Sequence, residues 1–188
     1  PQGSLYTFLN KIAKRFPKKQ LCTLAYLHTY NPPINLKIAS NITTLFCPIE
    51  MDRGNPISLK NNNKPVANAL ARWQSASKNL FVWDYTVQFA NYISPFPNVS
   101  YFEENYTTFK ANNVKGLFVQ GYADVPGDFS ELRQYLLAKL LWDASIDVKA
   151  TTADFLRGFY GKAASEIENY LNNYYKNEWF GDIAENII

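Results

Sequence analysis

Acidic, aromatic and amide side chains collect at the ends of short apolar runs in this sequence. The clearest run is Asn79–Tyr85, in which apolar residues lead into Trp83, Asp84 and Tyr85. A carboxyl group can transfer a proton or attack a substrate in acid–base and nucleophilic catalysis. An aromatic ring beside it can hold a flat ligand such as a base or a sugar ring. The residue types in this run therefore indicate a ligand site at the end of a strand.

Three further runs, residues 21–27, 42–47 and 116–121, follow the same plan. Each is short, apolar and bounded by polar residues, which is typical of a buried strand. Because ligands bind at the carboxyl ends of parallel strands, the side chains near these ends are candidate site residues. They are Tyr26, His28, Glu50, Asp52, Arg53, Gln120 and Tyr122.

The candidates also have purely structural interpretations. Asp84 can cap the next turn or pair with Arg53. Glu50 and Asp52 can be solvated loop acids, and the single histidine can be a hydrogen-bonded structural residue. Trp83 alternates with Asp84 along its strand, so Trp83 belongs to the core if its face is the one that meets the helices.

The elements that position these strand ends alternate along the chain. Apolar residues at helical spacing predict helices at residues 4–16, 65–73, 102–109, 132–141, 152–159 and 163–175. Together with the four strands, these helices alternate with strands along most of the chain, and strict alternation would also place a helix between the first two strands. Such alternation predicts an α/β fold, with a parallel sheet and crossover helices.

The spacing of the runs is close to the value of about 31 residues per unit in a (β/α)8 barrel of about 250 residues. Four units amount to half of such a barrel. No Gly-x-Gly-x-x-Gly fingerprint and no Walker A motif follows any strand, which argues against a dinucleotide-binding or P-loop domain. A small flavodoxin-like sheet is the alternative. We expect residues 1–188 to form a single α/β domain.

Charge and composition exclude several classes of function. The net charge is +3, and the densest basic group lies at residues 11–19 on the polar side of a predicted helix, so we expect no nucleic-acid partner. No run of about 18 apolar residues is present, so we expect no transmembrane segment, and no signal peptide is visible. Two distant cysteines and one histidine offer no metal-ligand cluster. We therefore expect two buried free thiols, no metal and no cofactor.

A series of short motifs, taken in order, resembles one protein family. The motifs are Ala25-Tyr26, Asn31-Pro32-Pro33, Cys47-Pro48-Ile49-Glu50, Val82-Trp83-Asp84-Tyr85, Pro95-Phe96-Pro97, Lys115-Gly116-Leu117-Phe118, Gln120-Gly121, residues 135–143 and Phe159-Tyr160-Gly161. From about Ser4 to Tyr175 the chain resembles the bacterial, glycoside-hydrolase-like family catalogued as domain of unknown function 4838. The resemblance implies a TIM-barrel catalytic domain of a larger secreted, periplasmic or cell-surface protein that acts on glycans.

The resemblance also implies that this chain is the C-terminal half of the barrel, with about four strands and extra C-terminal helices. Related glycosidase barrels often carry their main acidic pair on the fourth strand, so we expect the isolated chain to be inactive. A half barrel leaves sheet edges and an inner apolar face uncovered. We therefore expect its partner to be the missing N-terminal half or a second copy of the chain.

In this interpretation Asp84 and Glu50 are the candidate catalytic carboxylates of an O-glycosyl hydrolase. Such enzymes need carboxyl groups about 5–5.5 Å apart for retention or about 6.5–9.5 Å apart for inversion, and neighbouring strands about 4.8 Å apart allow both. The expected carbohydrate-binding residues are Tyr26, His28, Asp52, Arg53, Trp83, Tyr85, Gln120 and Tyr122. The alternatives are a non-catalytic carbohydrate-binding module and a small α/β domain with a role in binding or assembly.

Overall fold

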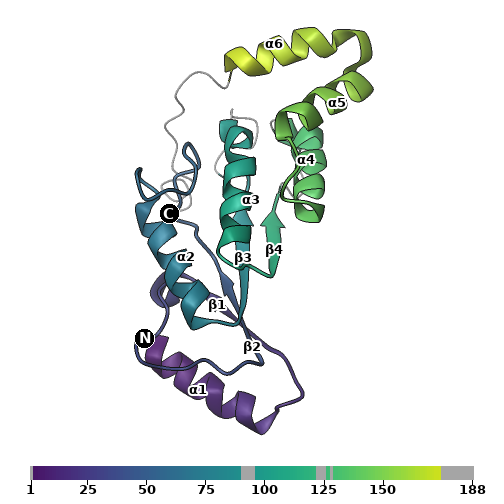
Figure 1. Cartoon of the computed structure of the whole chain (residues 1–188). Coiled ribbons are helices and arrows are strands. Elements are labelled where there is room, and N and C mark those ends of the chain that lie inside the picture. The colour runs from purple at the N-terminus through teal and green to yellow at the C-terminus, as the bar shows by residue number, and fades with distance from the viewer. Residues whose placement is uncertain (1, 90–95, 122–125, 128, 175–188) are drawn as a thin grey trace. The chain divides into compact units, whose positions relative to one another are not determined.

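A computed structural model describes residues 2–89, 96–121, 126–127 and 129–174 of the chain (Figure 1). The α-helices are α1 (Gln2–Arg15), α2 (Lys64–Ala76), α3 (Phe102–Ala111), α4 (Ser130–Trp142), α5 (Val148–Tyr160) and α6 (Ala164–Tyr174). The strands are β1 (Leu21–Ala25), β2 (Ile42–Phe46), β3 (Asn79–Tyr85) and β4 (Gly116–Gln120). Short 3-10 turns form η1 (Leu27–Thr29), η2 (Pro97–Tyr101) and η3 (Gly161–Ala163).

The four strands form one parallel sheet in the order β1-β2-β3-β4. The prediction of an α/β fold with a parallel sheet is therefore confirmed. Strand order that follows chain order is the arrangement of a β/α barrel, whereas flavodoxin-like and Rossmann sheets reverse direction at a switch point. The sheet is consistent with half of a β/α barrel followed by additional helices, and the flavodoxin-like alternative does not fit.

The helix that strict alternation would place between the first two strands is not present. The connection from β1 to β2 contains only η1 and extended segments. Pro32 and Pro33 lie in the middle of this connection. A proline lacks the backbone N–H that a helix interior needs, and it forces the preceding residue away from helical geometry. The parallel crossover is made by irregular chain instead.

The described residues cluster into two compact units. The first unit contains Pro1–Met51, Ile57–Tyr85 and Thr108–Val119 and therefore holds most of the sheet. The second contains Asp52–Pro56, Thr86–Thr107 and Gln120–Ile188 and holds the later helices. The assignment of residues 1–188 to a single domain stays a prediction.

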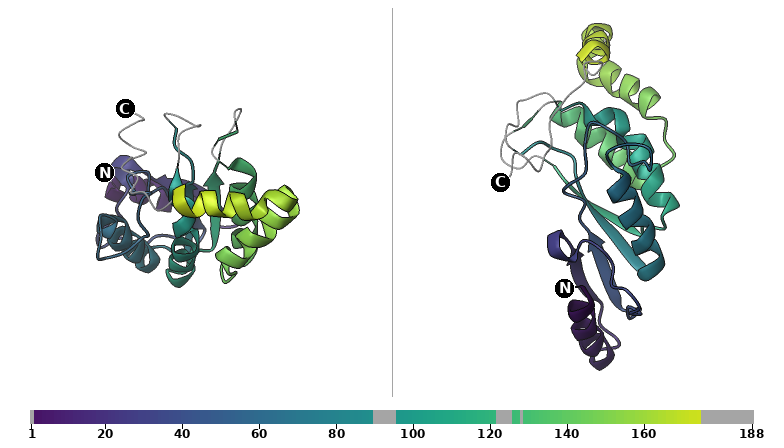
Figure 2. Two further views of the ribbon diagram at one scale, coloured as in Figure 1. Left: turned by 90° about the horizontal axis from the view of Figure 1, so that it is seen from above. Right: turned by 90° about the vertical axis from the view of Figure 1, so that its left-hand side faces the viewer.

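In the first unit, α2 lies along one face of the sheet (Figure 2), and α1 reaches the same face through Tyr6. Tyr6 of α1 lies 5.7 Å from the ring of Trp73 of α2, and its hydroxyl forms a 2.9 Å hydrogen bond with that of Thr44 on β2. Thr44 is in register with Leu80 of β3, so both side chains point to this covered face. Alternation along each strand then assigns six buried residues to the same face: Ile42, Thr44, Phe46, Leu80, Val82 and Asp84. Tyr85 at the end of β3 is also buried, but alternation puts it on the opposite face.

The opposite face of the sheet is open. Cys22 is in register with Thr43, and Leu24 and Phe81 are both in register with Leu45, so these residues share that face. Leu24 is 43% exposed, and Phe118 on β4 is 49% exposed. Phe81 lies directly against Gly116 of β4, since a Cβ at Gly116 would be 2.3 Å from the Phe81 ring. An apolar sheet face with little cover results.

The end of α1 is tied to the start of β2 by one side chain. The amide of Asn41 donates hydrogen bonds of 3.0–3.2 Å to the carbonyls of Ala13, Phe16 and Lys19. Terminal carbonyls of a helix have no partner within the helix, so this amide supplies one. On α1, Tyr6 and Ala13 are buried, whereas Phe8 and Phe16 are exposed.

A buried arginine organises the second unit. The Arg133 guanidinium of α4 donates to the Asn98 side chain and to the Phe96 carbonyl, and it lies 5.7 Å from the centre of the Phe96 ring. Asn98 in turn donates to the Thr86 carbonyl at 3.1 Å. A buried guanidinium needs such acceptors to offset its lost hydration. Arg133 therefore joins α4 to the segments that follow β3.

We expect the uncovered sheet face to make the chain self-associate when it is alone. Apolar surface and unpaired strand edges favour association, and Leu24 and Phe118 are exposed on this face. Sedimentation velocity at rising concentration should show dimers or larger species, and the double variant Leu24→Lys, Phe118→Lys should be mainly monomeric. Ile34→Lys is a matched control, since Ile34 is 88% exposed in a loop. A wild-type chain that stays monomeric would contradict the expectation.

Gly116 should be intolerant of a side chain because of Phe81. We expect Gly116→Ala to lower the free energy of unfolding by roughly 1–2 kcal/mol, since the ring must move to admit the methyl group. Urea titration followed by circular dichroism measures the change. Gly121→Ala is the control, because a Cβ at Gly121 meets no atom within 4 Å. The cost should shrink in a Phe81→Leu background, and an equal cost in both backgrounds would rule out this contact as its cause.

The two thiols should differ sharply in reactivity. Both cysteines are free, and Cys47 is buried directly after β2. The prediction that both are buried is wrong for Cys22, which is exposed because its side chain lies on the less covered face of the sheet. Burial raises the pKa of the Cys47 thiol to about 12, and only a thiolate attacks a disulfide reagent. A chromogenic disulfide at pH 8 should therefore label one thiol per native chain and two per unfolded chain. Native Cys22→Ser protein should not react, and rapid labelling of that variant would show that Cys47 is accessible.

Candidate functional site

Aromatic rings gather at the carboxyl end of β3 and at the centre of β4 in the first unit. The Trp83 and Tyr85 rings are 6.2 Å apart and nearly parallel, with 26° between their planes. Phe118 meets Trp83 edge-on, with ring centres 4.5 Å apart. Trp83, Tyr85 and Phe118 form what we call the aromatic cluster. Phe81 and Phe118 point to the open face of the sheet, and alternation along β3 puts Trp83 and Tyr85 on the same face as Phe81. The aromatic cluster therefore lies on the open face.

Asp84 lies on the other face of β3. It is 4% exposed and alternates with Trp83, in line with Leu80 and Val82 on the helix-covered face. Its carboxylate accepts a 2.9 Å hydrogen bond from the backbone N–H of Tyr85. The structure thus gives the open face to Trp83 and the covered face to Asp84. Successive side chains of a strand point to opposite faces, so Trp83 and Asp84 cannot share one.

Glu50 lines a pocket at the carboxyl ends of β1 and β2. The pocket has a volume of about 720 Å³, which is within the size range of small-molecule sites. The residues that line it come from the connection after β1, the connection after β2 and the first turns of α2. They are Leu27, Tyr30, Asn31, Glu50, Asn62, Lys64, Pro65, Val66, Asn68 and Arg72. We call it the β1–β2 pocket.

The walls of the β1–β2 pocket are fixed by contacts with α2. The indole N–H of Trp73 donates a 2.7 Å hydrogen bond to the Tyr30 carbonyl, and the Tyr30 ring lies 4.9 Å from that of Phe46. The Arg72 guanidinium donates to the Asn31 side chain. Glu50 is exposed, and Lys64 and Arg72 also line the pocket. Amides and charges of both signs therefore surround a carboxylate that solvent can reach.

Tyr26 and His28 follow β1 but are not among the residues that line this pocket. Tyr26 is half-buried, and its backbone N–H donates to the Thr29 hydroxyl at 3.1 Å. The His28 side chain is exposed in η1, and its carbonyl accepts from the Gln2 side chain at 3.0 Å. Their roles in ligand binding stay predictions.

Three other candidates belong to the second unit. The Asp52 carboxylate accepts from the Gly54 N–H at 2.9 Å and from the Asn55 amide at 2.8 Å, so it shapes its own loop. Arg53 is buried. The backbone carbonyl of Gln120 accepts two hydrogen bonds from Thr86, one from its N–H at 3.1 Å and one from its hydroxyl at 3.0 Å. Tyr122 lies outside the described residues.

Sequence reasoning missed Phe118 of the aromatic cluster and the pocket residues Tyr30, Asn31, Lys64 and Arg72. The position of Phe118 could have been found, since it follows Gly116 by two residues in a predicted strand and must share its face. The α2 residues gave no such signal, because a polar residue on a surface helix is usually only solvated.

The described part of the chain contains no group of three histidine, cysteine or acidic side chains placed to hold a metal ion. In the same residues no helix is long and apolar enough to cross a bilayer.

Comparison with known proteins places the chain in a family. No curated protein and no solved structure matches the sequence. A family match does extend over residues 1–172, most of the chain. The chain therefore belongs to the family described as "Domain of unknown function (DUF4838)", the one predicted from its motifs.

Proposed function

We propose that this chain is part of a glycoside-hydrolase-like domain that acts on glycans, and that its strand ends line the carbohydrate site. The aromatic cluster of Trp83, Tyr85 and Phe118 carries the proposal. Trp83 and Tyr85 lie in the last three residues of β3, at the carboxyl end where β/α folds place their ligands, and Phe118 lies at the centre of the neighbouring β4. A site of action outside the cytoplasm, where polymeric glycans are found, is part of the same proposal.

The geometry of the cluster suits a sugar ring. The apolar C–H face of a pyranose stacks on an aromatic face, and the half-buried Trp83 and the exposed Phe118 are the rings of the cluster that a ligand can reach. Tyr85 is only 7% exposed and stacks on Trp83, so it supports that ring rather than binding the sugar itself. Phe118 supports Trp83 from its edge, which fixes the indole before a ligand arrives. A surface held in place before binding loses less entropy on binding.

The β1–β2 pocket supplies polar groups that such a site needs. Sugar hydroxyls require donors and acceptors, and this pocket offers Asn31, Asn62 and Asn68 beside Glu50. In the catalytic form of the proposal, Glu50 and Asp84 are the two carboxyl groups. Glu50 is reachable from solvent, as a general acid or nucleophile must be, and Asp84 lies at the end of the neighbouring strand.

A second candidate function is carbohydrate binding without hydrolysis. It is favoured by one observation, the position of Asp84 on the helix-covered face with its carboxylate bound to the Tyr85 N–H. In that arrangement Asp84 shapes the end of β3 and thereby orients Tyr85. The aromatic cluster keeps its role in either case.

Two variants, made in the longest natural protein that contains this chain, test glycan binding and glycan hydrolysis separately. We expect Trp83→Ala to weaken glycan binding on an array about tenfold or more, since it removes most of the stacking surface. Trp142→Ala is the control, because Trp142 is also a tryptophan, is 93% exposed and lies on α4. Equal binding by wild-type protein and Trp83→Ala would exclude the aromatic cluster as the carbohydrate site.

The second variant, Asp84→Asn, tests the carboxylate. If Asp84 takes part in the chemistry, hydrolysis of the glycans found on the array should fall by roughly 10²–10⁴-fold while binding remains. Glu50→Gln is measured in parallel, and Glu166→Gln on the exposed start of α6 serves as the control. Unchanged turnover in Asp84→Asn would remove Asp84 from the mechanism. Glycan binding by wild-type protein without any hydrolysis would select the non-catalytic function.

A further inference from the structure

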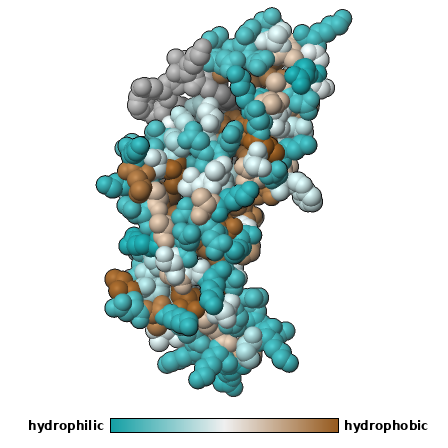
Figure 3. All heavy atoms as spheres, viewed as in Figure 1, coloured by the Kyte–Doolittle hydropathy of each residue, from teal (hydrophilic) through white to brown (hydrophobic). Residues whose placement is uncertain are grey.

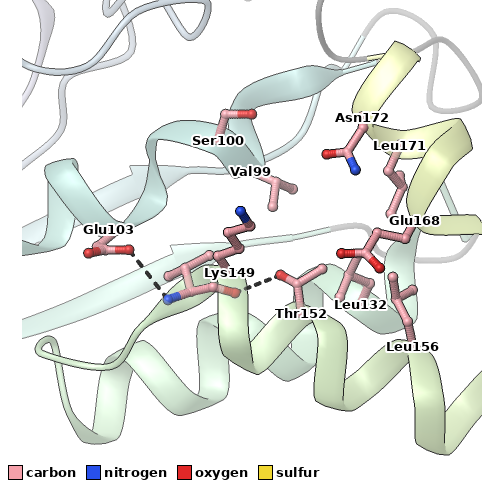
Figure 4. Close-up of a pocket in the computed structure, with 11 residues that line it drawn as sticks. Val99, Ser100, Glu103, Leu132, Lys149, Thr152, Leu156, Glu168, Leu171 and Asn172 are labelled. Atoms are coloured by element: carbon pink, nitrogen blue, oxygen red, sulfur yellow. Dashed lines mark hydrogen bonds between the residues drawn. The ribbon is translucent and has the colours of Figure 1, made fainter. Parts of the chain in front are cut away.

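A cavity of about 400 Å³ lies among the helices of the second unit, and none of the residues discussed above as candidate site residues lines it. Its walls come from η2, α3, α4, α5 and α6 (Figure 4). The floor consists of the buried aliphatic side chains Val99, Leu132, Leu156 and Leu171. None of the described lining residues is aromatic, so the cavity does not offer the stacking surface that a sugar prefers.

Two hydrogen bonds fix the walls of the cavity, and one of them engages the carboxylate of Glu103. The Glu103 carboxylate of α3 accepts from the Val148 N–H at 3.3 Å, which ties α3 to the start of α5. The Thr152 hydroxyl donates to the Val148 carbonyl at 2.7 Å, within α5. Glu103 is therefore a structural acid, and its contact defines one side of the cavity.

The remaining charged groups at the cavity have opposite signs. Lys149 of α5, Glu168 of α6 and the Asn172 amide are directed towards the same space (Figure 4). Among the described residues, no ion pair within 4 Å joins Lys149 to Glu168, although both line one cavity. An ammonium and a carboxylate held apart over an aliphatic floor are complementary to a ligand that carries both charges and an aliphatic body.

We propose that this cavity binds a small zwitterion with aliphatic side chains, of the size of a free amino acid or a dipeptide. Lys149 pairs with the carboxylate of the ligand, Glu168 pairs with its ammonium group, and Asn172 can hydrogen-bond to the amide of a dipeptide. The aliphatic side chains of the ligand cover Val99, Leu132, Leu156 and Leu171. The volume of about 400 Å³ lies within the range of sites that take small organic molecules.

The site is distinct from the proposed carbohydrate site in chemistry and in residues. The aromatic cluster and the β1–β2 pocket belong to the first unit, whereas every residue that lines this cavity belongs to the second. A failure to bind glycans would therefore leave this proposal intact, and a failure to bind a zwitterion would leave the proposed carbohydrate site intact.

Titration calorimetry on the 188-residue chain tests the proposal with leucyl-leucine as the probe. We expect saturable binding of leucyl-leucine, and binding at least about tenfold weaker for the same dipeptide with an acetylated N-terminus and an amidated C-terminus. Glycyl-glycine, which keeps both charges and lacks the aliphatic side chains, should also bind about tenfold more weakly. These comparisons use wild-type protein only, so they do not depend on the folding of any variant.

Variants then assign the charges. Lys149→Met should weaken binding of leucyl-leucine about tenfold and should leave the affinity for the C-terminally amidated dipeptide nearly unchanged. Glu168→Gln should also weaken binding of leucyl-leucine about tenfold, and it should leave the affinity for the N-acetylated dipeptide nearly unchanged. Lys162→Met and Glu166→Gln are matched controls on exposed positions that do not line the cavity, and they should bind as wild type does.

Three results would overturn the proposal. The first is the absence of saturable binding of leucyl-leucine. The second is equal affinity for the free and the doubly blocked dipeptide, which would mean that the charges play no part. The third is an equal loss of affinity in Lys149→Met and Lys162→Met, which would indicate binding elsewhere on the surface.

Discussion

Side-chain alternation along β3, combined with the packing of α1 and α2 on one face of the sheet, is the constraint on which the first unit depends. Register with β2 puts Leu80 beside Thr44 and Val82 beside Phe46, both on the face that Tyr6 and the helices cover. Once those two positions are set, every other residue of β3 has its face determined. Asp84 must follow Leu80 and Val82, and Trp83 must follow Phe81. This alternation therefore decides that the open face carries aromatic side chains and that the covered face carries the Asp84 carboxylate.

The covered face is held by polar contacts as well as by apolar packing. The Tyr6 hydroxyl meets Thr44 inside the core, and burial raises the pKa of Tyr6 to about 12, so the hydroxyl stays neutral at ordinary pH. The Trp73 N–H reaches the Tyr30 carbonyl, and the Asn41 amide closes the end of α1. Each of these groups would destabilise the fold if it were buried without a partner, because it would have lost its hydrogen bonds to water. They therefore specify where α1 and α2 lie on the sheet.

The open face and the cavity among the later helices offer two different kinds of chemistry. Trp83, Tyr85 and Phe118 group aromatic rings, whereas the cavity among the later helices has aliphatic side chains together with Lys149 and Glu168. Apolar side chains also interrupt a largely hydrophilic surface in Figure 3. Most of these are isolated positions, which are ordinary on folded proteins. The open sheet face differs because Leu24 and Phe118 are exposed together with strand edges at β1 and β4.

The sequence by itself determined the class of fold, the approximate positions of the four strands and the family. Short apolar runs, helical periodicity and motif order are local properties, so they can be seen without the structure. It also located the strand ends at which Trp83, Asp84 and Tyr85 stand. Only the tertiary structure decided which of these residues faces the helices, because alternation gives two faces without saying which one is covered. It also decided that no helix joins β1 to β2, that Phe118 meets Trp83, and that α2 residues line a pocket with Glu50. Those outcomes depend on contacts between segments far apart in the chain, such as Tyr6 with Thr44 and Asn31 with Arg72, and no pattern within a single segment encodes them.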